Sequence, residues 1–211
     1  MKSTTLTLPI FLAAAVLSLA GCSFLKPSGV TARYFVLSPT PAAASAPAST
    51  SAGTNLSVGV GYVTLPPYLF TSAMQCRSNA NEMVRLESAV WSERLDKGLQ
   101  RVLAANLGAM LPTDSIRLST WRREDVAVEV YVIVERFDVD IRGRGELVAW
   151  WRVLSPGGDK ELESGEFRGV RQGEPPLKSP EGAAATMSTL AGDLSRQLAD
   201  AIKQATPAKG G

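Results

Sequence analysis

The sequence contains no histidine among its 211 residues and only two cysteines. Histidine carries protons near pH 7 and is a common metal ligand, so its absence excludes His-based catalytic triads, HExxH zinc sites and haem ligation through histidine. The 22 Lys and Arg residues nearly balance the 20 Asp and Glu residues. Because no basic block is available to neutralise a row of phosphates, a nucleic-acid partner is not expected. Composition and length therefore predict one domain that is not an enzyme.

Long apolar runs are also absent, except at the N-terminus. The segment from Leu6 to Ala20 follows a single positive residue, Lys2, and ends in small side chains. This layout is typical of a secretory signal peptide, and the run is shorter than the roughly twenty residues that a membrane-spanning helix needs. A short buried helix is the alternative, but the run has no amphipathic face. We therefore expect residues 1–21 to be a signal peptide.

The residues at the end of this run, Leu19-Ala20-Gly21-Cys22, resemble the lipobox of bacterial lipoproteins. The resemblance implies cleavage before Cys22, a diacylglycerol on its thiol and an N-acyl chain on its amine, with no further cofactor. Two or more chains are sufficient for stable membrane attachment, whereas one is not. Ser23 stands where retention in the inner membrane would favour Asp. The resemblance therefore implies the periplasmic face of the outer membrane.

Lipidation of Cys22 leaves Cys76 without an internal partner. A single remaining thiol cannot form an intramolecular disulfide. Cys76 has the same strand parity as Met74, which favours a buried and inert thiol. A reactive or intermolecular thiol is the alternative.

Two stretches have the composition of linkers. Residues 38–55 consist mainly of Pro, Ala, Ser and Thr, and residues 206–211 form a short polar tail. Such segments cannot bury a core, so we expect a flexible loop and a disordered tail. Residues 22–205 are predicted to form one domain that includes the flexible loop at 38–55.

Hydrophobic periodicity predicts an α+β domain. Alternation predicts strands over 32–37, 56–63, 74–78, 82–86, 126–139, 146–154 and 162–170. The parity change after Val134 predicts a β-bulge near Arg136. Helical spacing predicts one amphipathic helix over 90–111 and a second that begins at Ser179-Pro180-Glu181 and continues to Ile202. Together these patterns predict an antiparallel β-sheet with both helices packed on one face.

The sequence offers few candidates for chemistry. Gly59-Val60-Gly61 lacks the third glycine of a dinucleotide fingerprint and is better explained by a strand that another group approaches closely. Asp138 and Asp140 lie on one side of a strand, so a carboxylate pair or a Ca²⁺ contact is one interpretation and solvated edge charges are the other. No metal site or catalytic residue is expected.

The aromatic residues are more informative. Trp150 and Trp151 are consecutive in a predicted strand, so their side chains must point to opposite faces of the sheet. The face away from the helices then carries one of the two tryptophans, together with Tyr131 and Ile133, which indicates a partner or oligomer surface. Cover by a loop around Pro66 and Pro67 is the alternative.

Several motifs, taken in order, resemble one family. The lipobox is followed by Tyr34-Phe35-Val36-Leu37, by Val63-Thr64-Leu65-Pro66-Pro67-Tyr68-Leu69, and by Trp91-Ser92-Glu93-Arg94-Leu95. This set is similar to the ABC-type transport auxiliary lipoproteins (PqiC/YmbA-like). The resemblance implies a non-enzymatic accessory of an MCE lipid-transport system that docks the periplasmic conduit at the outer membrane.

The expected partners are therefore an MCE-domain protein, the outer membrane and further copies of the chain. The candidate interaction residues are Leu65, Pro66, Pro67, Tyr68, Leu69, Trp150 and Trp151, and Cys22 is the candidate lipid attachment site. A structural lipoprotein of another envelope assembly machine is the alternative function.

Overall fold

The computed structural model describes residues 31–40, 56–113 and 115–206. The predicted signal peptide, Cys22, most of the predicted loop and nearly all of the predicted tail lie outside these residues. The described residues form the following helices and strands: β1 Arg33–Phe35, β2 Ser57–Thr64, β3 Ala73–Asn79, β4 Glu82–Trp91, α2 Leu95–Met110, β5 Ser115–Leu118, β6 Val128–Val139, β7 Arg144–Leu154, β8 Glu161–Gln172 and α3 Pro180–Ala205. Short 3-10 helices join some of them: η2 Pro67–Leu69, η3 Arg123–Asp125 and η4 Pro156–Gly158.

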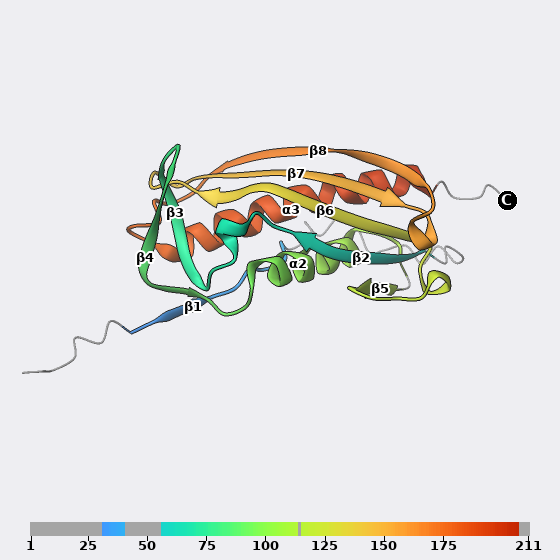
Figure 1. The fold of residues 1–211 in the computed structure, drawn as a ribbon, viewed down its shortest axis with the longest axis horizontal. Helices are drawn as coiled ribbons and strands as arrows, with labels where there is room; N and C mark the ends of the chain where they lie inside the picture. The colour runs from blue at the N-terminus through green and yellow to red at the C-terminus, as the bar shows by residue number, and fades with distance from the viewer. Residues whose placement is uncertain (1–30, 41–55, 114, 207–211) are drawn as a thin grey trace, which may run out of the picture. The chain divides into compact units, whose positions relative to one another are not determined.

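The larger sheet has five strands in the order β5-β2-β6-β7-β8 (Figure 1). Strands β6, β7 and β8 form the antiparallel meander that alternation predicts. The sheet as a whole is mixed, however, because β2 runs parallel to both β5 and β6. Parallel neighbours need a crossover, and α2 supplies it between β2 and β5. The α+β class is confirmed, and the expectation of an antiparallel sheet is corrected at β2.

The register of the larger sheet shifts in three of its strand pairs, β2–β6, β6–β7 and β7–β8, and the first two shifts bear on the predictions and the packing. The β6–β7 register shifts between Val134 and Arg136, which confirms the predicted bulge. The β2–β6 register shifts between Val60 and Val63. There, the buried Gln100 of α2 donates to the carbonyl oxygens of Val60 and Gly61 at 3.0 and 2.8 Å, so the carbonyls at the shift are satisfied.

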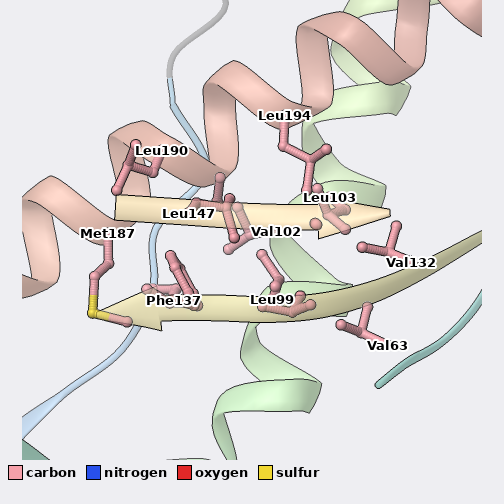
Figure 2. Packing of buried hydrophobic residues seen from close by; sticks show 14 of the residues in the cluster. Val63, Leu99, Val102, Leu103, Val132, Phe137, Leu147, Met187, Leu190 and Leu194 are labelled. Atoms are coloured by element: carbon pink, nitrogen blue, oxygen red, sulfur yellow. The ribbon is translucent and has the colours of Figure 1, made fainter. Parts of the chain in front are cut away.

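Both helices cover the same face of the larger sheet, here called the inner face. Figure 2 shows Leu99 and Leu103 of α2 and Leu190 and Leu194 of α3 on the side of the sheet where Phe137 of β6 also lies. These five side chains are fully buried and belong to one continuous apolar cluster. Burial of an aliphatic or aromatic side chain contributes about 1.5–3 kcal/mol, so this cluster is the main source of stability. The predicted packing of two helices on one face is confirmed.

A second, three-stranded sheet has the order β1-β4-β3. Phe35 of β1 pairs with Trp91 of β4, and the amide of Ser92 donates to the Phe35 carbonyl at 2.8 Å. These contacts hold Trp91 in the strand, so α2 begins at Leu95 rather than near Val90 as its periodicity predicts. Strand β5 was not predicted, because four residues carry too little alternation to be recognised.

Helix α3 begins as its sequence predicts, with Pro180 in the first turn followed by Glu181. Ser179 occupies the N-cap position, although its side chain makes no capping hydrogen bond. The chain after β1 is held against α3, where the Ser38 amide donates to the Ser188 hydroxyl at 3.0 Å. Among the described helices, none combines the length and the apolarity that a membrane span requires.

Candidate interaction surface

The face of the larger sheet that points away from the helices, here called the outer face, is partly covered by the protein's own loops. At the start of β6, Glu129 is only 4% exposed and accepts three hydrogen bonds. They come from Trp121 Nε1 at 3.0 Å, the Tyr131 hydroxyl at 3.1 Å and the Gly157 amide at 2.8 Å. Burial and the hydrogen bond to Glu129 raise the pKa of Tyr131. Glu129 therefore fastens the β5–β6 connection and η4 to the sheet.

Glycines make this cover possible. A Cβ atom on Gly59 would lie 2.6 Å from the ring of Trp121, and one on Gly61 would lie 2.6 Å from the ring of Tyr131. Both distances are far below van der Waals contact. The prediction of a strand that is closely approached by another group is thus confirmed.

The other end of β6 is covered around a second buried carboxylate, Asp138, which is 2% exposed. Arg77 of β3 donates to it through Nη2 at 2.7 Å and Nε at 3.1 Å, and Arg136 donates at 3.2 Å. The Tyr68 hydroxyl adds a bond of 3.2 Å. These contacts raise the pKa of Arg77, chiefly through its hydrogen bond to Asp138, and burial together with the Asp138 charge raises the pKa of Tyr68. Asp138 therefore clamps η2 and β3 to the larger sheet.

Between these two covered ends lies an open region. Thr64, Ile133, Trp150 and Glu166 are register partners on four neighbouring strands. Ile133 is 49% exposed and Trp150 is 48% exposed. Trp150 Nε1 donates to Glu135 Oε1 at 2.7 Å, which holds the indole against the sheet. We call Thr64, Ile133, Glu135 and Trp150 the outer window.

The candidate interaction residues differ in their exposure to solvent. Leu65, Leu69 and Trp151 are buried in the core, Pro66 is half-buried, and Pro67, Tyr68 and Trp150 are exposed. The two tryptophans point to opposite faces, as strand geometry requires. Pro66 precedes η2, whose Tyr68 donates a hydrogen bond to Asp138. This loop therefore covers one end of the outer face and leaves Trp150 half-exposed. Sequence reasoning missed both carboxylate clamps, because alternation indicates which face a residue occupies but not which loop returns to it.

The two candidate acidic residues do not form a pair. Asp138 is bound by two arginines and a tyrosine, whereas Asp140 Oδ1 accepts the amides of Arg142 and Arg144 at 2.8 and 2.9 Å within the β6–β7 turn. Both are thus occupied by structural contacts. Within residues 31–40, 56–113 and 115–206, no group of three or more His, Cys, Asp and Glu side chains is placed to hold a metal ion.

Cys76 is a buried free thiol in β3. Burial and the nearby Asp140 raise its pKa, so the neutral thiol is favoured over the reactive thiolate. This arrangement agrees with the inert thiol that strand parity favours, and it leaves no route to an intermolecular disulfide without local opening.

Comparison with known families identifies the chain. The family model for the ABC-type transport auxiliary lipoprotein component matches residues 35–199. The chain belongs to this family. The matched region begins in β1 and ends in α3, so it contains both carboxylate clamps and the outer window.

Solved structures share the fold of this family member. A crystal structure of an uncharacterised protein superimposes with a TM-score of 0.65 at 19% identity, covering 82% of this chain and 99% of its own. A DUF330 protein from Xanthomonas campestris gives a TM-score of 0.60 at 13% identity, covering 82% of this chain and 95% of its own. At these identities the likeness concerns the fold alone. No curated protein sequence matches the chain.

Proposed function

We propose that the protein is a non-enzymatic accessory of an MCE lipid-transport system, anchored by acyl chains on Cys22 to the periplasmic face of the outer membrane. The family match over residues 35–199 is the observation that carries the proposal. Its task is positional. The anchor fixes the domain at the membrane, and the domain docks the periplasmic conduit.

The outer window is the surface proposed to receive the MCE protein. It holds a large aromatic ring and a large aliphatic side chain, both about half-exposed, on the two middle strands β6 and β7 of the larger sheet. Aromatic residues are enriched at protein interfaces, where they act as anchors. The inner face of the same sheet is filled by α2 and α3, so it offers no comparable surface.

Photo-crosslinking in cells tests this docking. A photoreactive amino acid replaces Trp150 in the full-length protein, and a matched control replaces Gln204, an exposed residue near the end of α3. We expect an MCE protein in the adduct from position 150 and none from position 204. Recovery of a subunit of a different envelope machine would instead support the alternative function. Absence of any MCE adduct at both Trp150 and Ile133 would overturn the docking proposal.

The anchor is tested separately with Cys22→Ser. Loss of the thiol removes the diacylglycerol attachment, so we expect the variant to leave the outer-membrane fraction. Cys76→Ala is the matched control, because it removes the other thiol and keeps the anchor. Retention of Cys22→Ser in the outer membrane would contradict lipidation at this residue.

A further inference from the structure

Strand β8 is a long free edge of the larger sheet (Figure 1). It extends over 12 residues, and within the described part of the chain it pairs with β7 alone. The opposite edge strand, β5, has only 4 residues. From Glu163 to Gln172 the register with β7 is unbroken, and β8 contains neither proline nor lysine. Short length, bulges, proline and lysine are the usual protection of an edge strand against another chain, so this part of β8 lacks them.

The backbone groups of alternate residues of β8 point to the open edge. The Gly173 amide donates to the Gly143 carbonyl at 2.8 Å, which continues the ladder on the β7 side. Because the direction of hydrogen bonding alternates along a strand, the even-numbered residues from Ser164 to Gln172 point away from β7. The Glu166 carbonyl agrees with this parity, since it accepts from Gln197 Nε2 of α3 at 3.1 Å. A carbonyl oxygen has two lone pairs, so this contact still permits a second hydrogen bond.

The charged residues of β8 are segregated along the strand. The acidic residues occupy its first half and the basic residues its second half: Glu161, Glu163 and Glu166, then Arg168 and Arg171. In an antiparallel pair of two such strands, the acidic half of one lies opposite the basic half of the other. Cross-strand pairs of opposite charge stabilise a sheet, whereas like charges directly opposite each other destabilise it.

One register of two antiparallel copies satisfies these charges. If the two-fold axis passes between the Phe167 residues, Glu166 of each strand lies opposite the partner's Arg168. Glu163 then lies opposite the partner's Arg171. Arg168 already contacts Glu166 of its own strand at 2.5 Å while its side chain stays 65% exposed, so the two pairs would form a ring of four alternating charges. A shift by two residues in either direction would place two Arg168 or two Glu166 side chains opposite each other.

We propose that β8 pairs with β8 of a second copy of the chain, antiparallel and with the two-fold axis at Phe167. The open backbone edge supplies the hydrogen bonds, and the order of charges selects a reversed copy of the same strand. Such an interface uses one surface patch on both copies. Because the two sheets join edge to edge, both outer windows face the same side and stay free for another partner. The inference goes beyond the proposed function, since it does not depend on the MCE protein.

Cysteine crosslinking in native membranes tests the pairing. In the proposed register Ser164, which is exposed, lies opposite the partner's Val170, which is 45% exposed. Full-length Ser164→Cys and Val170→Cys variants, with different tags and with Cys76→Ala in both, are produced in the same cells. We expect a disulfide between the two tags, and none when either variant is present alone, because identical positions away from Phe167 lie apart in antiparallel strands. Gln204→Cys in place of Val170→Cys is the matched control and should give no crosslink.

Charge reversal tests the register independently. Glu166→Arg places like charges opposite each other twice per dimer, so we expect the dimer to weaken about tenfold in sedimentation of the full-length protein in detergent. Adding Arg168→Glu to the same chain restores both pairs with exchanged signs and should restore the dimer. Glu87→Arg, at an exposed position of β4, is the control and should leave the dimer unchanged.

Several results would overturn the β8 pairing. They are absence of the mixed disulfide, an equal crosslink from Gln204→Cys, or failure of the double exchange to restore the dimer. A crosslink of Ser164→Cys to a different protein would assign the edge to another partner and reject the second copy. If Glu166→Arg does not fold, as judged by thermal melting, Arg168→Glu alone creates the same like-charge contact at an exposed side chain and still decides.

Discussion

The two faces of β6 are held by different kinds of interaction. On the inner face, residues from Val128 to Val139 bury an unbroken apolar row under two helices. On the outer face, the same strand buries a carboxylate at each end, Glu129 and Asp138, and exposes Ile133 between them. The hydrophobic effect is non-directional, so packing on the inner face stabilises the fold without requiring specific pairs of atoms to meet. On the outer face, the hydrogen bonds of Glu129 and Asp138 hold the covering loops in place. The outer window between these two carboxylates stays exposed.

Adjacent tryptophans provide the largest test of this comparison. Trp151 is 6% exposed and packs on Gly165, whereas Trp150 is 48% exposed. We expect Trp151→Ala to lower the free energy of unfolding by about 3–5 kcal/mol, because it removes a buried ring and leaves a cavity. Trp150→Ala should cost only about 1 kcal/mol and should abolish the MCE adduct formed from Ile133. Urea unfolding measures both, and similar losses would contradict the assignment of faces.

The Asp138 clamp should give the next largest effect. Asp138→Ala removes the carboxylate that Arg77 and Arg136 share and leaves two positive charges near each other without it. We therefore expect the free energy of unfolding to fall by about 3 kcal/mol. The matched control is Asp159→Ala, which breaks the surface ion pair with Arg123, whose members are more than half exposed. That control should change stability by less than about 1 kcal/mol. Equal urea midpoints for the two variants would mean that the clamp does not hold η2 and β3.

Glu129→Gln should have a smaller effect. The amide keeps one acceptor oxygen but places an NH₂ group among the Trp121, Tyr131 and Gly157 donors, and hydrogen bonds to charged groups contribute about 1.5–3 kcal/mol each. Partial replacement predicts a net loss of about 1–2 kcal/mol and faster proteolysis of the β5–β6 connection. Glu87→Gln, at an exposed position of β4 whose side chain makes no hydrogen bond within the described residues, is the control and should stay within about 0.5 kcal/mol.

Alkaline pH should loosen the covered ends before the inner face. Burial raises the pKa values of Tyr68, Tyr131 and Cys76, so these groups hold their protons in the folded state. In the unfolded chain they release protons at their ordinary values of 10.0 for tyrosine and 9.0 for cysteine. The unfolded state then binds fewer protons, so stability is complete below these values and declines as the pH rises through them. Tyr68→Phe with Tyr131→Phe should flatten the decline in a pH series of thermal melts, and an unchanged slope would contradict this origin.

The inner face could be predicted from the sequence because its determinants are local. The valines from Val128 to Val134 alternate, the parity change marks the bulge at Arg136, and the spacing of α3 places its stripe on the sheet. The parallel pairing of β2 could not be predicted, because the alternation of apolar and polar residues is the same in parallel and antiparallel strands. The two carboxylate clamps could not be predicted either, because they depend on contacts between distant parts of the sequence. Arg77 and Asp138 are far apart in sequence, and only the return of β3 to the end of β6 brings them together.

Ile133→Lys should change stability least and tests directly whether the outer window is the docking site. Ile133→Lys places a charge at its centre, where the side chain is already 49% exposed, so unfolding free energy should stay within about 0.5 kcal/mol. A desolvated charge opposes close apolar contact, so we expect loss of the MCE adduct from position 150. Leu177→Lys is the matched control, because Leu177 is 62% exposed and lies outside the window. If both variants lose the adduct equally, the effect belongs to general surface charge, and the open centre of the outer face is not the docking site.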